Sequence, residues 1–460
     1  MGAPRNTAVY RRYEAVLKAP RALPLIVGGF VARTEVGGMS LALVLLIHHE
    51  TGSYRAGGLS VAVYLVTASA NRPVQGRLMD RYGRAGLLRL LTGAHLVLLV
   101  ALASSAAGGA PAGAVLVLCG AAGLTLPSLS AFIRVAWAGL PVSKDLLGTA
   151  YALDSVLYEL ALVSGPLLVG VLVALTPPAV PVVVLGVLAF AGTLLAASVP
   201  AGASAGASAP PGRTRSGSLT GVVRPVAALV SVGVALGAVA VVVPATAQAS
   251  GAIALSGPVQ ATWSVGSLAG GLWYGSRGWA GPPARRAAIA LTWFAAFLTL
   301  FAVWSDLLWR ALTLLTAGLA LAPALTTVLS LVPELVPASR LTEAFAWISA
   351  AEPAGAALGS WAAGSLVAAG RPTLAGWLPC VGAVCAVAVA GRRWPAAPDA
   401  GAGQEGSGVR PVPVGRPAPQ RARIPDAPAT ARPCAGRRRT GRNGASAPTE
   451  PSREPRRHRP

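Results

Sequence analysis

The sequence predicts an all-α membrane protein in which twelve transmembrane helices form two parallel six-helix repeats. Three observations carry this prediction: few charged residues, many long apolar segments, and similar motifs in the two halves of the chain. Of the 460 residues, 54% are hydrophobic and 12% are charged, whereas soluble domains carry about 25% charged residues. Most of the chain is therefore expected to face lipid or neighbouring helices.

Apolar segments long enough to cross a bilayer, roughly 20 residues in a helix, recur along the chain. Helices are expected because lipid cannot satisfy an open backbone, and because barrel strands have a shorter, alternating pattern. The first six predicted spans are residues 23–47, 57–75, 87–108, 112–134, 149–174 and 179–199. The second six are residues 225–247, 256–275, 286–305, 309–332, 342–369 and 373–390.

The orientation in the membrane follows from the bias of Lys and Arg toward cytoplasmic loops. The N-terminal segment and the loops after the second, fourth, sixth and eighth predicted spans are basic. Intervening loops such as SSAAGGAPAG (104–113) and TPPAVP (176–181) carry no charge. We therefore predict a multi-pass protein of the plasma membrane with both termini in the cytoplasm.

Composition divides the chain into five segments. They are a cytoplasmic N-terminal segment (1–22), a first six-helix bundle (23–199), a cytoplasmic linker (200–224), a second bundle (225–392) and a Pro/Arg-rich basic tail (393–460). The composition of the tail predicts disorder. The net charge is +22, but residues 391–460 hold 15 arginines and five acidic residues. Most other basic residues lie in short loops, so we expect the lipid bilayer and no nucleic acid as a partner.

Two pairs of similar motifs predict an internal repeat. The segment AYALDS (150–155) resembles AFAWIS (344–349) at an offset of 194 positions. The segment GRLMDRYG (76–83) resembles GLWYGSRG (271–278) at an offset of 195. Six predicted spans separate equivalent positions, so both copies have the same orientation in the membrane and the repeat is parallel.

The segment QGRLMDRYGRAG (75–86) resembles a loop motif of the major facilitator superfamily, Gly-x-x-x-Asp-Arg-x-Gly-Arg, which lies between that family's second and third helices. The matching residues are Gly76, Asp80, Arg81, Gly83 and Arg84. The motif departs where Ala85 replaces a second basic residue, and in the second half, where Gly275 replaces the acid. The resemblance covers about residues 20–392 and implies the major facilitator fold. Bacterial, high-GC, drug-efflux-like members are the most similar in character.

The resemblance implies that these five motif residues form a conformational latch. In the family, the motif acid pairs with arginines and with a neighbouring helix end, which holds the cytoplasmic ends of the two bundles together in one state. A carboxylate is favoured at a helix N-terminus, and arginine pairs with it through two hydrogen bonds. The alternative is that the arginines only set membrane topology, which would require neither Asp80 nor the glycine spacing.

The segment LALVSGPLLVG (160–170) resembles in part the fifth-helix Gly-Pro motif that is associated with antiporters of the family. Its matching residues and their second-half equivalents are Gly165, Pro166, Gly170, Gly359 and Gly364. Small residues permit close helix contact, so we predict tight packing of the fifth and eleventh spans between the halves. Glycines that simply face lipid are the alternative. The motif favours export.

Ionisable residues at bilayer depth are costly and mark candidate functional sites. The candidates for binding substrate or a proton are Arg33, Asp154, Glu159 and Glu352. Arg33 and Glu35 lie two positions apart and cannot share a helix face. Because the first and fifth helices are neighbours in the family, we expect Arg33 to pair with Glu159, or second with Asp154. The pair is either a structural ion pair or a site that binds substrate or a proton. Glu352 is a candidate to gate the pathway, to bind substrate or a proton, or to cap a helix end.

The leading hypothesis is a secondary active transporter that moves a small organic solute by alternating access, with protons as the coupling ion and export as the direction. Trp263, Trp347 and Trp361 are candidate cavity walls, with anchors at the membrane interface as the alternative. The Trp-rich, charge-poor second half favours hydrophobic substrates. The alternatives are a polytopic membrane enzyme, such as a lipid or sugar transferase, and a non-transporting sensor. The sequence has no Asp-x-x-Asp cluster and no Walker lysine loop. We expect a monomer that is not an enzyme and needs no metal or cofactor.

Overall fold

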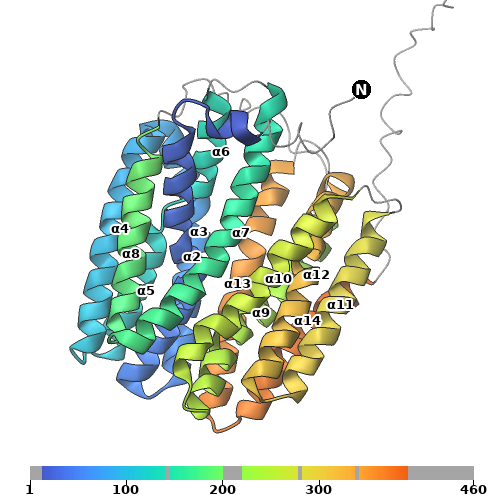
Figure 1. Ribbon diagram of the computed structural model, residues 1–460. Coiled ribbons are helices and arrows are strands. Elements are labelled where there is room, and N and C mark those ends of the chain that lie inside the picture. The colour runs from blue at the N-terminus through green and yellow to red at the C-terminus, as the bar shows by residue number, and fades with distance from the viewer. Residues whose placement is uncertain (1–12, 141–143, 200–219, 278–281, 337–340, 392–460) are drawn as a thin grey trace, which may run out of the picture. The chain divides into compact units, whose positions relative to one another are not determined.

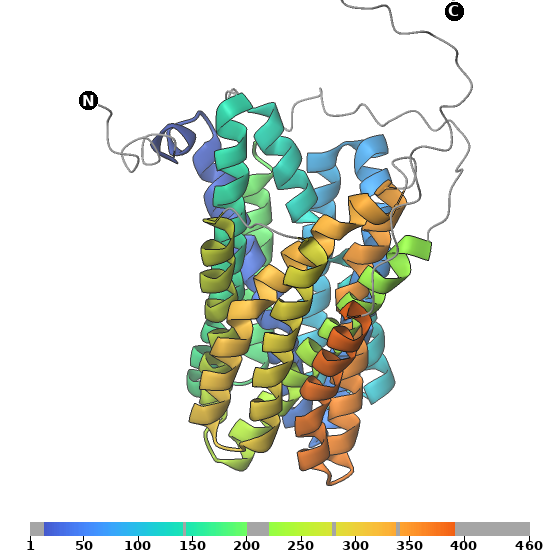
Figure 2. The same cartoon turned by 90° about the vertical axis from the view of Figure 1, so that its right-hand side faces the viewer.

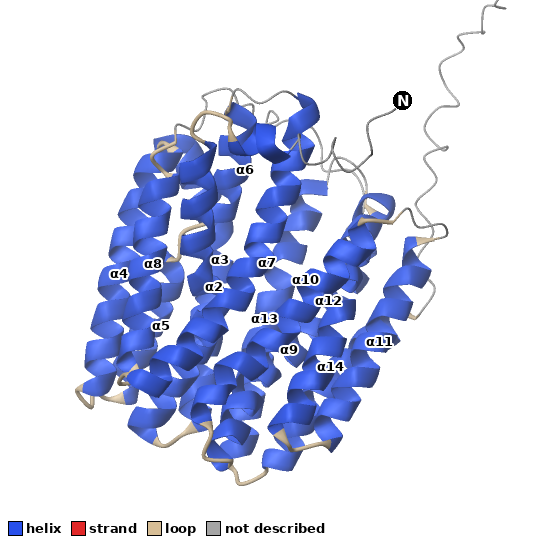
Figure 3. Cartoon of the chain, viewed as in Figure 1, coloured by secondary structure: helices blue, strands red, loops and turns tan. Residues whose placement is uncertain are grey.

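The computed structural model describes residues 13–140, 144–199, 220–277, 282–336 and 341–391 (Figure 1). All of them belong to one compact unit, Met1–Ala400. Within these ranges the chain forms helices joined by short connections and contains no strand (Figure 3). The all-α prediction is therefore confirmed. Most of the predicted linker and the whole predicted tail lie outside the described residues.

The helices fall into two sets of six spans. The first set is α2 (Ala22–Thr51), α3 (Tyr54–Tyr82), α4 (Arg84–Ala107), α5 with α6 (Ala112–Thr125 and Leu129–Gly139), α7 (Lys144–Leu175) and α8 (Ala179–Ala196). The second set is α9 (Val223–Ala249), α10 (Ser256–Gly275), α11 (Pro283–Val303), α12 (Leu307–Leu335), α13 (Leu341–Ala368) and α14 (Pro372–Ala390). The turns η2 (Thr220–Val222) and η3 (Ile253–Leu255) flank α9.

Helices pack in the same order within each set. Helix α2 packs against α7 and α8, as α9 packs against α13 and α14, and α4 packs against α8 as α11 packs against α14. Figure 2 shows the second set from its outer side. The two sets meet where α3 packs against α13 and α7 against α10. The predicted pair of parallel six-helix repeats is confirmed.

Three of the twelve spans are less apolar than the others. Among the described helices, nine are long and apolar enough to cross a membrane, and these do not include α3, α10 and α13. Each of these three packs on the other repeat, so part of its surface contacts protein instead of lipid. Polar and small residues are tolerated on such a surface. The contact between the repeats thus permits the weaker hydropathy of these spans but does not require it, because α7 packs against α10 and is among the nine.

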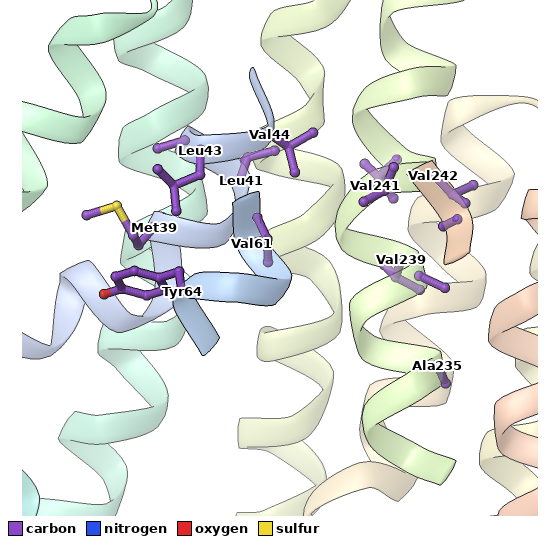
Figure 4. Packing of buried hydrophobic residues seen from close by; sticks show 14 of the residues in the cluster. Met39, Leu41, Leu43, Val44, Val61, Tyr64, Ala235, Val239, Val241 and Val242 are labelled. Carbon is purple, nitrogen blue, oxygen red and sulfur yellow. The ribbon is translucent and has the colours of Figure 1, made fainter. Parts of the chain in front are cut away.

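The apolar core runs across both repeats. Met39, Leu41 and Val44 of α2 lie near Val61 of α3, and valines of α9 continue the same buried cluster (Figure 4). Helices α2 and α9, the first helices of their repeats, are buried on most sides. They are therefore apolar around much of their circumference.

The fourth predicted span, 112–134, is not one continuous helix. Helix α5 ends at Thr125 and α6 begins at Leu129, so Leu126–Ser128 interrupts the span. Pro127 has no backbone N–H and disfavours a helical preceding residue. Polar side chains of α3 bond the interrupted backbone: Gln75 donates to the carbonyl oxygen of Leu126 (2.8 Å) and accepts from the N–H of Ser128 (3.0 Å). Asn71 donates to the carbonyl oxygen of Leu124.

The second repeat does not share this interruption. Pro323 lies 196 positions after Pro127, but α12 is helical through it. Gly266 and Gly270 stand 195 positions after Asn71 and Gln75, and a Cβ on either glycine would meet the backbone of α12. Side-chain amides thus support a broken helix in the first repeat, whereas glycines permit direct packing of an unbroken helix in the second.

Replacing Gln75 by Ala should destabilise the protein. The carbonyl oxygen of Leu126 and the N–H of Ser128, which belong to part-buried residues, would each lose a hydrogen bond, at about 0.5–1.5 kcal/mol for each bond. Chemical unfolding in detergent measures this change, with Val74→Ala, a neighbouring exposed position, as the control. A loss below about 0.5 kcal/mol, the range of ordinary surface substitutions, would contradict the support role of Gln75.

Candidate functional site

A cavity of about 1540 Å³ lies between the two repeats. Its walls come from α2, α3, α6, α7 and α8 of the first repeat and from α10, α12 and α13 of the second. At one end it is lined by Tyr13, which precedes α2, by Arg134 of α6, and by Gly76 and Ser276 in the C-terminal part of α3 and at the end of α10. We call this end the open face of the molecule.

The opposite end of the interface, the closed face, is filled by contacts between the repeats. Ser360 of α13 donates to the carbonyl oxygen of Gly58 in α3 (3.3 Å). Tyr54 donates to the carbonyl oxygen of Pro244 in α9 (3.1 Å). A Cβ on Gly257 of α10 would meet the backbone of α7. The cavity is therefore accessible from one face only.

A buried ion pair forms one wall of the cavity. The guanidinium of Arg33 in α2 donates to both carboxylate oxygens of Asp154 in α7, at 2.6 and 3.2 Å. The side chains are 4% and 12% exposed. The guanidinium also lies over the ring of Tyr158, 5.5 Å from its centroid. The preferred prediction that Arg33 pairs with Glu159 is therefore wrong, because Asp154 occupies both donors that point toward α7.

Glu159 lies in the same cavity without that partner. Its carboxyl faces Ser267 of α10, which belongs to the other repeat. Its Oε2 atom is buried and has no hydrogen-bond partner among the described residues. Asp154 and Glu159 both line the cavity, although five positions separate them on α7. Of these two carboxyl groups, only that of Glu159 has a buried oxygen with no hydrogen-bond partner among the described residues.

Several other polar groups at the cavity wall lack a partner. Within the described ranges, the buried side-chain atoms with no hydrogen bond include Ser69 Oγ, Ser128 Oγ, Thr193 Oγ1 and Arg33 Nε, and all four residues line the cavity. Buried polar atoms without a partner are uncommon in folded proteins. A cluster of them around one cavity favours a polar molecule as its occupant.

Arg72 and Glu352 are opposite charges on facing helices of the two repeats. Arg72 of α3 lines the cavity and is exposed within it. No hydrogen bond or ion pair joins it to another described residue. It interacts electrostatically with Glu352 of α13. The sequence singled out Glu352, which is not part of the cavity lining, although Ser349 and Ala350 of the same helix are.

The five motif residues of the predicted latch lie at the open face. Gly76 lines the cavity mouth, and the guanidinium of Arg81 lies 5.3 Å from the ring centroid of Tyr82. Gly83 has φ of 92° between α3 and α4, a conformation that side chains rarely adopt, and Arg84 begins α4. Asp80 lies in α3, but its side chain is outside the described residues.

The glycines of the Gly-Pro motif lie where helices approach closely. A Cβ on Gly165 would meet the backbone of α2, and one on Gly170 would meet α10. In the second repeat, a Cβ on Gly359 would meet α9 and one on Gly364 would meet α3. Each of these positions faces another helix.

The tryptophans do not contribute to the cavity. Of the three candidates, Trp347 and Trp361 are 57% and 45% exposed, and neither they nor Trp263 belong to the described lining. The composition of the second half therefore gives no support for a hydrophobic substrate.

Sequence reasoning missed a polar cluster beside the cavity. The Oε1 atom of Glu35 accepts from the hydroxyl of Tyr64 (2.8 Å) and lies 2.9 Å from Nε2 of His95. A histidine in the middle of the apolar span 87–108 was the signal that could have found it. Tyr64 and Gln75 gave no comparable signal, because neutral polar side chains are common in spans.

No family model and no curated protein sequence matches the chain. Several solved structures match its fold. The nucleoside transporter NupG is 14% identical with a TM-score of 0.60, and the match covers 80% of this chain and 96% of that one. An inward-open xylose transporter XylE from E. coli is 14% identical, with a TM-score of 0.58 and coverage of 80% and 94%.

A bacterial homologue of the iron transporter ferroportin, in an inward-facing state, is 13% identical with a TM-score of 0.61. That match covers 80% of this chain and 97% of the other. The chain therefore has the all-α major facilitator fold. The likeness to these structures establishes the fold.

Proposed function

We propose that this protein is a monomeric secondary active transporter that exports a small organic solute by alternating access, driven by protons. The observation that carries the proposal is the cavity between two similar six-helix repeats, accessible from one face and closed at the other. If the repeats rock about the cavity, the closed-face contacts open while the open face closes. The solute is then exposed to each side of the membrane in turn.

The lining of the cavity favours a polar solute with a negatively charged group. Arg72 offers a guanidinium without a described partner, and guanidinium groups bind carboxylates or phosphates through two hydrogen bonds. Hydroxyls of Ser69, Ser128 and Thr193 have unused hydrogen-bonding capacity. Glu159 would accept a hydrogen bond from a hydroxyl or amine of the solute. Arg33 and Asp154 already bond each other, so we assign them to holding α2 and α7 together.

The open face is cytoplasmic in this proposal, and the membrane is the plasma membrane. The support is the bias of Lys and Arg toward the loops of the open face. The partial Gly-Pro motif of α7 is the support for export.

Transport in proteoliposomes with an imposed pH gradient tests the function. Matched pairs of solutes, such as nicotinate with nicotinamide and benzoate with benzamide, separate the negative charge from the rest of the molecule. The expected result is accumulation of acids but not amides, with the preference lost in Arg72→Gln and retained in part in Arg72→Lys. Equal movement of acids and amides would contradict the role of Arg72. Failure of every solute to accumulate would contradict the transport function.

Asp80→Asn should slow the transport of every solute without changing membrane insertion. The latch proposal gives the reason, because the acid would stabilise the state in which the open face has closed. Initial rates and surface expression measure the two effects, with Glu50→Gln on the closed face as the control. Unchanged rates in Asp80→Asn would remove the latch.

A further inference from the structure

The buried imidazole in the polar cluster of Glu35, Tyr64 and His95 has no counterpart in the second repeat. The three side chains come from α2, α3 and α4 and are 3% exposed or less. The residues at offsets of 194 to 196 from His95 are Ile289, Ala290 and Leu291. The second repeat, whose fourth span is unbroken, thus has apolar residues where the first repeat places His95.

The hydrogen bonds of His95 require a shared proton. Nδ1 lies 2.9 Å from the carbonyl oxygen of Ala122, which can only accept, so Nδ1 carries a hydrogen. Nε2 lies 2.9 Å from Oε1 of Glu35, and this contact needs one more proton on either atom. The pair then consists of an imidazolium with a carboxylate, or of a neutral imidazole with a carboxylic acid. Both arrangements hold one transferable proton and have no net charge.

Loss of that proton would break one of the two bonds. A neutral imidazole has a single N–H, so His95 could donate to Ala122 or to Glu35, but not to both. If it donates to Glu35, Nδ1 would instead accept from the hydroxyl of Thr125, whose Oγ1 atom lies 3.3 Å away. Ala122 lies in the last turn of α5, three residues before the end of the helix at Thr125. The neighbouring carbonyl groups of Leu124 and Leu126 bond Asn71 and Gln75. The proton is therefore linked to the interruption of the fourth span.

The pair has a route to water, because Glu35 lines the cavity. The ionisable groups that face the cluster are few. On α2 and α7, Arg33 and Asp154 neutralise each other. On α3, Arg72 interacts electrostatically with Tyr64, as does the thiol of Cys119 on α5. The described part of α4 contributes His95 alone.

We propose that the proton shared by Glu35 and His95 is the coupling proton, and that its release into the cavity loosens the interrupted fourth span. The coupling role rests on the proposed transport function. One N–H or O–H bond breaks at the contact between Nε2 and Oε1, and the proton bonds to a water molecule of the cavity. No other covalent bond is made or broken. Because Leu126, Pro127 and Ser128 line the cavity, a change in this segment alters the wall that contacts the solute.

Maleimide labelling of Ser128→Cys tests the link in the full chain, reconstituted in liposomes, with the native cysteines replaced. The thiolate is the species that reacts with maleimide, so every labelling rate rises with pH. The readout is therefore the rate of Ser128→Cys divided by that of Ala112→Cys, an exposed position that does not line the cavity. This ratio should change with pH by roughly 5-fold or more. In Glu35→Gln the ratio should be independent of pH, because an amide N–H donates permanently to Nε2. His95→Gln should also abolish the dependence. In Glu159→Gln, the matched control, the dependence should persist.

Two results would overturn the proposal: a pH-dependent labelling ratio that persists in both Glu35→Gln and His95→Gln, or a ratio in the parent that does not change with pH. The fate of the transport function is read separately, from solute accumulation by the parent under a pH gradient. Accumulation that persists in Glu35→Gln overturns the coupling role alone. Labelling that depends on Glu35 without any solute accumulation overturns the transport function and supports the proton site.

Discussion

Arg33→Gln is expected to lower the free energy of unfolding by about 3–5 kcal/mol, because it leaves a buried carboxylate without its partner. Asp154 has a 12% exposed side chain and both of its oxygens accept from Arg33. A carboxylate of this kind is stabilised by the guanidinium and is costly alone. Unfolding in detergent, followed by tryptophan fluorescence, measures the loss.

The double variant Arg33→Gln/Asp154→Asn separates the ion pair from the shape of the site. Two neutral amides can hydrogen-bond each other, so the double variant should regain most of the lost stability. Arg72→Gln is the matched control, because this arginine has no described partner and its loss should change stability by about 0.5 kcal/mol or less. Equal losses in Arg33→Gln and Arg72→Gln would contradict the structural role of the pair.

Gly257→Leu should prevent the closed face from closing. A side chain at this position would overlap the backbone of Pro166 and Gly170 in α7, and backbone cannot move aside as a flexible side chain can. Overpacking of this kind costs about 1–3 kcal/mol, which corresponds to a change of roughly 5- to 150-fold in the ratio of the two states. The variant should therefore favour the state in which the contacts of the closed face have separated.

Labelling of Ser267→Cys in sided vesicles detects this change, because Ser267 lines the cavity. A membrane-impermeant maleimide added on the closed-face side should react faster when Gly257→Leu is present. Gly275→Leu, on the same helix, is the control, because a Cβ there meets nothing within 4 Å. An unchanged rate in Gly257→Leu would mean that the repeats do not separate at this contact.

Most of the fold could be predicted from the sequence because lipid imposes simple rules. Long apolar segments mark the spans, and the offsets of about 194 and 195 positions mark the repeat. The interruption in the fourth span was missed, although Pro127 inside the predicted span 112–134 signals a break. Pro323 shows why that signal is insufficient, since α12 continues through it. Whether the helix breaks at the proline depends on whether the facing helix supplies side-chain amides or glycines.

The site could be predicted only in part, because helix periodicity gives the angular separation of residues and not the rotation of the helix against its neighbours. Arg33 was correctly marked as a buried charge, but its partner depended on the rotation of α7. That rotation brings Asp154 to Arg33 and leaves Glu159 beside Ser267 of the other repeat. His95 and Glu35 are 60 positions apart, and no local pattern connects them.

Distances between spin labels on the two faces test alternating access most directly. One pair, Tyr82→Cys with Ser276→Cys, spans the repeats at the open face, and the other, Ala112→Cys with Arg371→Cys, spans them at the closed face. Across pH, and with Gly257→Leu added, we predict that the open-face distance shortens whenever the closed-face distance lengthens. Two distances that stay fixed under all of these conditions, or that lengthen together, would contradict a cavity that opens to alternate sides.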